Sequence, residues 1–313
     1  MKIVVLDKDT LGADIDLAAL EAQGEVEVYG NTPPALVRER LLRADVAVLN
    51  KIKLCEENLS GTTVRLICVA ATGYDNIDTE YCRKSGIALC NVPGYSTHSV
   101  AQLTLAMALT LATRLSEYAD FVACGAYTES GVANRLTPVF HELAGKTWGV
   151  VGGGGIGRQV ARIAQAMGCR VLMCRREKET EFEAADLDRL CRESDIVSLH
   201  CPLTAQTRGM LDAARIASLK TGAIVVNTAR GAVTDEAALA QAVKQGRIAL
   251  GCDVYSAEPF GKDHPFYGLC GLPQVCLTPH MAWGSFEARM RCVAMMGENI
   301  RRFYAGEKHN RIV

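Results

Sequence analysis

Short runs of consecutive apolar residues alternate with helix-like segments along almost the whole chain. The runs are rich in β-branched residues and predict strands at 2–6, 46–50, 65–70, 87–91, 148–152, 170–174, 195–200, 223–228, 248–254 and 275–280. Segments such as 33–44, 158–168 and 235–246 place their apolar residues at helical spacing instead. Because the strands are apolar at consecutive positions, we expect both of their faces to be buried, as in parallel sheets covered by helices. The pattern predicts two doubly wound α/β domains.

Two longer helical segments bracket the second set of strands. The first is predicted from Ser99 to about Cys124 and separates the two strand sets. The last, 284–306, follows the final strand, and we expect it to cross back to the first domain. A length of 313 residues also fits two domains, since single domains commonly hold ~100–200 residues.

Charge and cysteine usage narrow the class of protein. The 34 basic and 35 acidic residues nearly cancel, which gives no support for binding to nucleic acid or to a membrane surface. The N-terminal "MKIVVLDKDT" lacks the apolar core of a signal peptide, and no stretch reaches the ~20 apolar residues of a membrane span. The thirteen cysteines include no CxxC pair, so we interpret them as reduced and buried rather than as disulfides or metal ligands. A cytoplasmic protein without a metal is expected.

The segment "WGVVGGGGIG" has five glycines in six positions directly after an apolar run. It contains the spacing Gly152-x-Gly154-x-x-Gly157 between a predicted strand and a predicted helix. Such glycines allow a tight turn, close approach of a pyrophosphate to the backbone, and close helix–sheet contact. The N–H groups at the helix start, around Gly155 and Ile156, would hold the phosphates. A tight glycine turn without a ligand is the alternative, but the βαβ context favours a bound dinucleotide.

The end of the next strand bears on which dinucleotide binds. An acid at this point would bond the ribose 2′-hydroxyl of NAD, but the chain has Arg175 and Arg176, followed by Glu177. Guanidinium groups suit a 2′-phosphate, which favours NADP over NAD. The alternative is a solvated arginine pair with Glu177 in the acidic role, and NAD as the cofactor.

Three later strands each end in an isolated functional group. Arg230 follows the strand at 223–228, Asp253 and Glu258 follow the next strand, and His280 follows the last. The carboxyl ends of strands in an open α/β sheet are where ligands bind. Arginine can bind a substrate carboxylate, while a histidine oriented by a carboxylate can protonate a carbonyl oxygen as it receives a hydride. The set indicates chemistry on a 2-oxo acid, although each residue alone is more often structural or solvated.

The sequence resembles the D-isomer-specific 2-hydroxyacid dehydrogenases over nearly its full length. The resemblance is carried by "AATGYDNID", "NVPGYSTHSVAQLTLAMAL", "ELAGKTWGVVGGGGIG", "PLTAQTRGM", "NTARGAVTDEAAL", "DVYSAEP" and "LTPHMAW". It implies two domains of the Rossmann or flavodoxin type with a cleft between them, and usually a homodimer. It also implies a discontinuous substrate domain, which we place at residues 1–98 and 285–313, and a cofactor domain at residues 99–284.

The resemblance assigns roles to individual residues. Arg230, Glu258 and His280 match the family's catalytic set. The backbone of Ala71, Thr72 and Gly73 would hold the substrate carboxylate together with Arg230, and Asp253 would contact the nicotinamide carboxamide. The remaining residues expected to line the cofactor groove are Thr104, Cys201, Pro202, Thr207, Thr228 and Ala229.

Some positions depart from the family pattern or refine it. Gln102 stands where an acid is common, and Arg175 stands where many members have an acid. Trp283, three residues after His280, is similar to glycerate dehydrogenases and hydroxypyruvate reductases and favours a small substrate such as hydroxypyruvate or glyoxylate. A core or interface role for Trp283 is the alternative. For the whole chain, the alternatives are a nucleotide-sensing protein of the corepressor type and, less well supported, oxidation of formate or phosphite.

Overall fold

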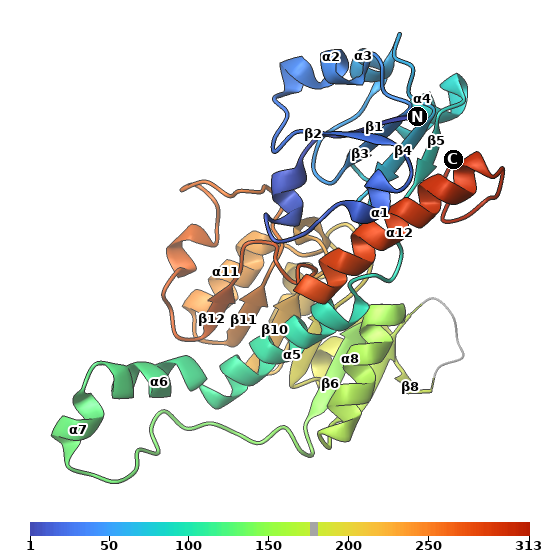
Figure 1. Cartoon of the computed structure of the whole chain (residues 1–313). Helices are drawn as coiled ribbons and strands as arrows, with labels where there is room; N and C mark the ends of the chain where they lie inside the picture. The colour runs from blue at the N-terminus through green and yellow to red at the C-terminus, as the bar shows by residue number, and fades with distance from the viewer. Residues whose placement is uncertain (176–180) are drawn as a thin grey trace. The chain divides into compact units, whose positions relative to one another are not determined.

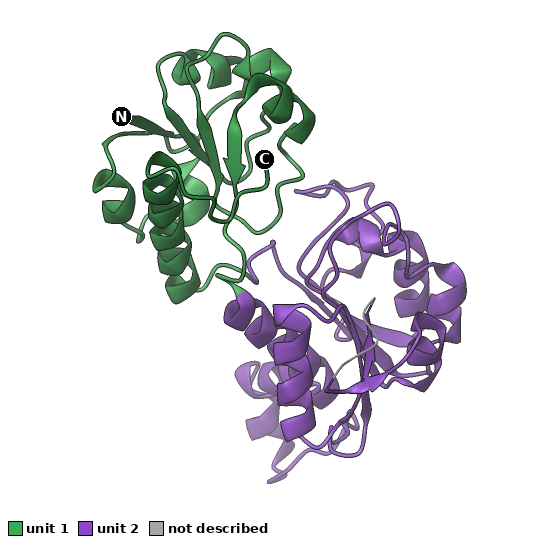
Figure 2. Ribbon diagram, turned by 90° about the vertical axis from the view of Figure 1, so that its right-hand side faces the viewer, with its two compact units in different colours: residues 1–96, 283–313 green, residues 97–282 purple. Residues whose placement is uncertain are grey.

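The computed structural model describes residues 1–175 and 181–313, and these form two compact units (Figure 2). Unit 1 comprises Met1–Ser96 and Trp283–Val313, and unit 2 comprises Thr97–Ala282. The chain therefore leaves unit 1 once and returns to it once. Within the described ranges, no helix is long and apolar enough to cross a membrane.

Unit 1 is built on a sheet of five parallel strands in the order β2-β1-β3-β4-β5 (Figure 1). The strands are β1 (Lys2–Val5), β2 (Glu25–Val28), β3 (Val46–Leu49), β4 (Leu66–Val69) and β5 (Ala88–Cys90). The helices are η1 (Lys8–Leu11), α1 (Ala18–Glu21), η2 (Pro34–Leu36), α2 (Val37–Leu41), α3 (Glu56–Leu59), α4 (Thr79–Ser85) and α12 (Phe286–Tyr304). Helix α12 buries Cys292, Met296 and Ile300, spaced four residues apart, against the sheet, so the last helix completes the core of unit 1.

Unit 2 is built on a second parallel sheet, with the order β12-β11-β10-β9-β6-β7-β8. Its strands are β6 (Thr147–Val151), β7 (Arg170–Cys174), β8 (Glu183–Ala184), β9 (Ile196–Leu199), β10 (Ala223–Asn227), β11 (Ile248–Cys252) and β12 (Val275–Leu277). Its helices are α5 (Thr97–Thr113), α6 (Leu115–Ala123), α7 (Ala126–Ser130), α8 (Gly155–Ala166), α9 (Leu187–Glu193), α10 (Ala213–Ser218), η3 (Gly231–Val233), α11 (Glu236–Lys244) and η4 (Tyr267–Leu269). The strand order reverses at β6, which is the switch point where ligands bind in such sheets.

The predicted doubly wound α/β class is confirmed, with differences in individual elements. Strand β2 was not predicted, because its "EVEV" alternates charged and apolar residues at an edge of the sheet. The predicted helix at 99–124 is two helices, since Arg114 adopts a left-handed backbone conformation with φ of 56°. Figure 1 shows α6 and α7 extending beyond the body of unit 2.

The cysteines differ sharply in exposure. Among the described residues Cys124, at the end of α6, and Cys270, after η4, are exposed, whereas eight are buried: Cys68, Cys82, Cys90, Cys169, Cys191, Cys201, Cys252 and Cys292. Burial raises the pKa of the Cys191 thiol to about 12 and that of Cys90 to about 11. The buried thiols therefore stay protonated and inaccessible to reagents, whereas the exposed thiols are accessible.

Candidate active site

Three neighbouring strands of unit 2 deliver the residues that the sequence singled out for catalysis. Strands β10, β11 and β12 pair in parallel, with Asn227 opposite Cys252 and Cys252 opposite Leu277. Arg230 follows β10, Glu258 follows β11 and His280 follows β12, so all three lie beyond the same edge of the sheet. Parallel pairing of buried strands thus brings together residues that are up to 50 positions apart in sequence.

Asn227, at the end of β10, shapes the turn that carries Arg230. Its buried side chain accepts a hydrogen bond from the N–H of Ala229 at 3.0 Å and donates one to the carbonyl oxygen of Arg230 at 3.0 Å. Asn227 was not predicted as a site residue, although an amide at the end of an apolar strand is an available signal. The turn continues into Gly231, where a Cβ atom would lie 2.1 Å from the carbonyl carbon of Tyr255.

His280 and Glu258 form a direct imidazole–carboxylate contact. Nδ1 of His280 lies 2.6 Å from Oε2 of Glu258, and the two side chains are 24% and 31% exposed. The other carboxylate oxygen, Oε1, accepts the N–H of Tyr255 at 3.0 Å. The pair is therefore held at its carboxylate end and is partly exposed, so a molecule bound beside it could reach the imidazole.

The backbone at His280 is strained. Its φ of 51° lies in the left-handed region, which costs a non-glycine residue of the order of 1–3 kcal/mol. Asp253 supports this conformation: its fully buried carboxylate accepts hydrogen bonds from the hydroxyl of Thr278 and from the N–H groups of Met281 and Ala282 at 2.5–2.8 Å. Burial raises the pKa of Asp253, and these hydrogen bonds lower it in part. Asp253 thus fixes the segment on both sides of His280.

A second histidine at the same edge of the sheet has different surroundings. His200 follows β9, and both of its ring nitrogens are buried without a hydrogen-bond partner among the described residues. Burial lowers the pKa of His200 to about 3, so its imidazole stays neutral at physiological pH. Among the residues that the structure describes, His280 contacts a carboxylate and His200 does not.

The glycine loop fits a dinucleotide by its geometry. A Cβ atom on Gly157 would lie 1.9 Å from the carbonyl oxygen of Gly152, and one on Gly152, whose φ is 105°, would lie 2.7 Å from the carbonyl carbon of His200. These two glycines are required by the fold itself. Gly154 differs, because a Cβ there would meet no atom of residues 1–175 and 181–313 within 4 Å and its φ of −74° suits any residue. An open glycine just before the first turn of α8, where Gly155 and Ile156 lie, is what a backbone approached by a phosphate needs.

Of the other predicted cofactor residues, Arg175 lies beside this loop. Arg175 directly follows β7, and its Cδ would lie 2.7 Å from a Cβ on Gly153, whereas Arg176 and Glu177 lie outside the described residues. Thr104 of α5 and Thr228 after β10 contact each other through their hydroxyl groups at 3.1 Å. Thr207 closes a turn by donating to the carbonyl oxygen of Pro202 at 2.6 Å, and Cys201 is buried beside it.

The predicted carboxylate-binding loop of unit 1 is held by an asparagine that the sequence did not single out. Asn91, after β5, donates to the carbonyl oxygen of Thr72 at 2.7 Å, and the Thr72 hydroxyl donates to Val92 at 3.0 Å. The N–H of Val92 in turn donates to the carbonyl oxygen of Ala71 at 3.1 Å. These bonds fix Ala71 and Thr72, which lead into Gly73, at the carboxyl end of β4.

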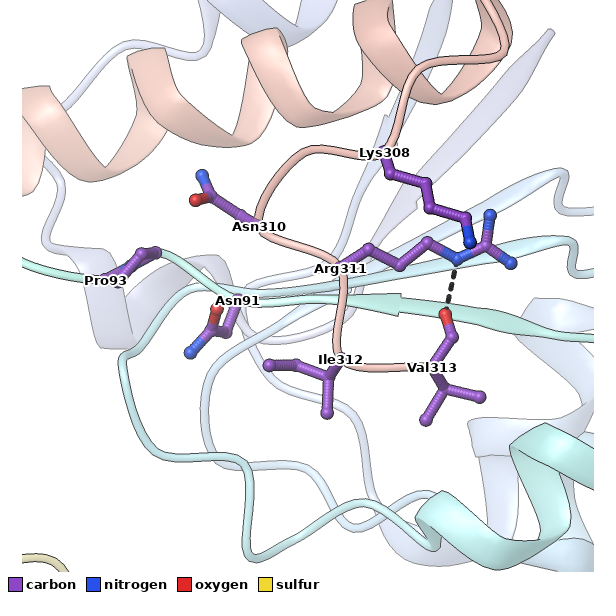
Figure 3. Close-up of a pocket in the computed structure, with 7 residues that line it drawn as sticks. All are labelled: Asn91, Pro93, Lys308, Asn310, Arg311, Ile312 and Val313. Atoms are coloured by element: carbon purple, nitrogen blue, oxygen red, sulfur yellow. Dashed lines mark hydrogen bonds between the residues drawn. The ribbon is translucent and has the colours of Figure 1, made fainter.

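Trp283 packs within unit 1. Its ring meets Tyr95 edge-on at a centroid distance of 6.2 Å and contacts the core beneath α12. Unit 1 also has a pocket of about 680 Å³ beside β5, lined by Asn91, Pro93, Lys308, Asn310, Arg311, Ile312 and Val313 (Figure 3). Of the residues lining this pocket, Asn91 alone is bonded to the loop at Ala71–Gly73, so the pocket adjoins that loop without including it.

Comparison with known proteins agrees with this geometry. Residues 105–282 match the family model described as the NAD-binding domain of D-isomer specific 2-hydroxyacid dehydrogenases. The chain is 33% identical to a glycerate dehydrogenase of Methylorubrum extorquens, covering 99% of this chain and 98% of the relative. It is 34% identical to a hydroxypyruvate reductase of Blautia hydrogenotrophica, covering 99% of both. The solved structure of the acyclic imino acid reductase Bsp5, in complex with NADPH and D-Arg, matches with a TM-score of 0.88 at 28% identity over the full length of both chains.

Proposed function

The chain belongs to the family of D-isomer specific 2-hydroxyacid dehydrogenases, and on this basis we propose that it reduces hydroxypyruvate or glyoxylate to the corresponding 2-hydroxy acid. It is an oxidoreductase that uses a nicotinamide dinucleotide to reduce 2-oxo acids. The substrate choice is supported by the names of the two relatives matched over their full length. Unit 2 is the cofactor-binding domain in this proposal, and unit 1 is the substrate domain.

The proposed mechanism gives each residue of the chain one task. A bound nicotinamide dinucleotide supplies the hydride for the carbonyl carbon. Arg230 and the backbone of Ala71–Gly73 bind the substrate carboxylate. His280 protonates the carbonyl oxygen, and since its Nδ1 is bonded to Glu258, the proton passes from Nε2. Glu258 keeps the ring oriented and stabilises the imidazolium, while Asp253 holds the segment from which the ring projects.

The observation that carries this proposal is the contact of 2.6 Å between His280 and Glu258 at the ends of adjacent strands. It is tested with a steady-state panel of 2-oxo acids against NADPH and NADH, following absorbance of the reduced cofactor. Turnover fastest with hydroxypyruvate or glyoxylate is expected. Cofactor binding without turnover of any oxo acid would contradict an enzymatic role and favour a nucleotide sensor.

NADP is the proposed cofactor form, and Arg175 supports it. Its side chain lies beside Gly153 of the glycine loop, where the adenosine end of a dinucleotide is expected. A guanidinium there would pair with a 2′-phosphate. Measuring Kd for both dinucleotides on the same protein decides between the two forms.

Acyclic imino acids are a second candidate substrate class, favoured by the full-length structural match to the reductase crystallised with NADPH and D-Arg. Reduction of an imine also adds a hydride to carbon and a proton to the neighbouring atom, so the same histidine would serve. The panel is therefore repeated with the oxo acids in the presence of ammonia or methylamine. A rate that rises with amine concentration identifies the imino acid as the substrate.

A homodimer formed through the arm of residues 115–140 completes the proposal. This arm contains α6 and α7 and exposes a set of large apolar side chains: Leu115, Val122, Tyr127, Val132, Leu136, Val139 and Phe140. Contiguous exposed apolar surface on a soluble domain marks a protein-binding face. A second copy of the chain is the proposed occupant, because the family resemblance implies a homodimer.

A further inference from the structure

Unit 2 contains a second imidazole–carboxylate pair, separate from His280 and Glu258. Nε2 of His264 lies 3.0 Å from Oε2 of Glu236, and the two side chains are only 6% and 9% exposed. Glu236 is the first residue of α11, and His264 lies in the long connection after β11. Both residues are remote from solvent, so the pair has no access to a substrate.

The carboxylate of Glu236 gathers further donors from that same connection. The N–H of Ser256 donates to Oε1 at 2.9 Å, and the Ser256 hydroxyl donates to Oε2 at 2.5 Å. Together with His264, three donors from the segment after β11 converge on one buried carboxylate. The carboxylate is buried although Ser256 is exposed, so each lost bond would leave a buried carboxylate oxygen short of a donor, and this favours the one arrangement.

His264 is itself fixed in orientation. The N–H of Phe266 donates to Nδ1 at 3.2 Å, so the ring hydrogen lies on Nε2 and points at Glu236. The ring stacks on Phe260 at 4.8 Å and meets Phe266 edge-on at 5.2 Å. Apolar rings thus enclose the imidazole, and its two ring nitrogens bond to the N–H of Phe266 and the carboxylate of Glu236.

The Glu236 bonds and the Glu258–His280 pair meet at two consecutive N–H groups of the chain. The N–H of Tyr255 donates to Glu258, and the next N–H, of Ser256, donates to Glu236. The Tyr255–Ser256 peptide crosses Gly231, the residue after Arg230, where a Cβ atom would lie 2.2 Å from the Ser256 nitrogen. A displacement of this peptide would be passed through the backbone of Tyr255 to the adjoining N–H, to which Glu258 is bonded.

We propose that Glu236 and His264 form a clamp that positions Glu258, and through it His280, by fixing the Tyr255–Ser256 peptide. Both are positioning residues in the reaction of the proposed function, on which this inference rests. Glu236 and His264 are far apart in the sequence. They act on the reaction only by holding the backbone in place, without touching the substrate. A misplacement of about 1 Å at a reacting group can cost ~100-fold in rate, so a partly released clamp is expected to be visible in kcat.

The test compares Glu236→Gln and His264→Phe with Asp235→Asn. In Glu236→Gln an amide N–H₂ replaces one accepting oxygen and opposes either the N–H of Ser256 or the hydrogen on His264, while the volume is nearly unchanged. Asp235→Asn removes a charge one residue away and keeps the hydrogen bond of the helix cap to Ala238. We expect kcat to fall ~10-fold in the first two variants, with KM for the oxo acid and the cofactor within about two-fold, and Asp235→Asn to match the unaltered protein.

Histidine resonances provide a readout that does not depend on turnover. In protein labelled at the histidine rings, the signals of His280 and His264 are identified among those of the six histidines by their loss in His280→Ala and His264→Phe. The clamp predicts that the His280 ring signal moves in Glu236→Gln and stays in place in Asp235→Asn. An unmoved His280 signal with unchanged kcat and a lowered melting temperature would reduce the pair to a structural role and overturn the proposal. If the unaltered protein turns over no oxo acid, the proposed function fails, and the His280 signal still decides on the clamp.

Discussion

His200 and His280 lie beyond strands of the same sheet, and their surroundings divide their roles. His200 is enclosed without a partner among the described residues, which lowers its pKa to about 3, whereas His280 is partly exposed and contacts Glu258. Both follow an apolar strand in the sequence, so the pattern alone does not separate them. The distinction depends on which side chains the fold places around each ring.

Removing the imidazole of His280 tests the proton donor. His280→Ala is expected to lower kcat by ~100-fold or more, since general acid catalysis contributes about that much, while the affinity for NADPH stays nearly unchanged. Steady-state rates and fluorescence titration with NADPH measure the two effects. His141→Ala, which alters an exposed histidine elsewhere, serves as control. An equal loss of cofactor affinity would assign His280 to binding instead.

The buried His200 makes a prediction about acid stability. Its pKa is lowered in the folded state, so below the usual value of about 6.5 the unfolded chain binds a proton that the folded chain does not. The free energy of unfolding is therefore unaffected by His200 above a pH of about 6.5, and it decreases as the pH falls from there towards about 3. His200→Phe, which has no ring nitrogen to protonate, should lose less stability between neutral and acidic pH. Urea unfolding of both proteins across this range measures it, and parallel curves would refute the assignment.

Arg175 is the residue on which cofactor preference is expected to depend. Arg175→Asp should weaken NADPH binding and shift the preference towards NADH, because a carboxylate repels a 2′-phosphate and can bond a 2′-hydroxyl. The ratio of kcat/KM for the two cofactors is the measurement. Arg43→Asp, at an exposed position of unit 1, controls for the change in net charge. An unchanged ratio would locate the adenosine end elsewhere.

Two glycines in the strand–loop–helix element from β6 to α8 are expected to differ in their roles. One is needed for folding, and the other is needed only for cofactor binding. Gly157→Ala pushes a methyl group into the Gly152 carbonyl and should lower both the melting temperature and NADPH affinity. In Gly154→Ala the methyl group meets no atom of the described part of the chain within 4 Å, so this variant should fold normally and bind NADPH less tightly. Thermal unfolding and cofactor titration of the two variants are compared. Unaltered NADPH binding in Gly154→Ala would show that the phosphate does not bind beside this glycine.

Elements with strong apolar patterns were predictable, and those defined by tertiary contacts were not. The strands at the centres of both sheets were predicted within two residues at most ends, because burial on both faces leaves an unbroken apolar run. Strand β8, of two residues, and the break at Arg114 carry no glycine or proline signal. In the site, the strand ends identified Arg230 and His280. Asn227, Glu236 and His264 were not identified, because their role depends on hydrogen bonds to residues brought near by the fold.

At the scale of the whole molecule, the arm of residues 115–140 predicts how the chain associates. Replacing Leu136, which is 73% exposed, by Asp is expected to convert a dimer to a monomer, because a charge in an apolar interface is costly to bury. Sedimentation velocity at several concentrations measures this. Leu42→Asp, at an exposed position of unit 1 that is 44% exposed, is the control. A protein that is monomeric before substitution contradicts the dimer.

The uneven exposure of the cysteines has a practical consequence for handling the protein. Thiolates, not thiols, react with alkylating reagents and oxidants, so the enclosed cysteines with raised pKa values are chemically quiet. Cys124 and Cys270 are the exposed exceptions among the described residues. A maleimide dye or spin label should therefore enter at these two positions of the monomer first, and Cys270→Ser would leave Cys124, after α6, as the one exposed cysteine among the described residues. During storage without reductant, crosslinking between molecules should begin at the same two sulfur atoms.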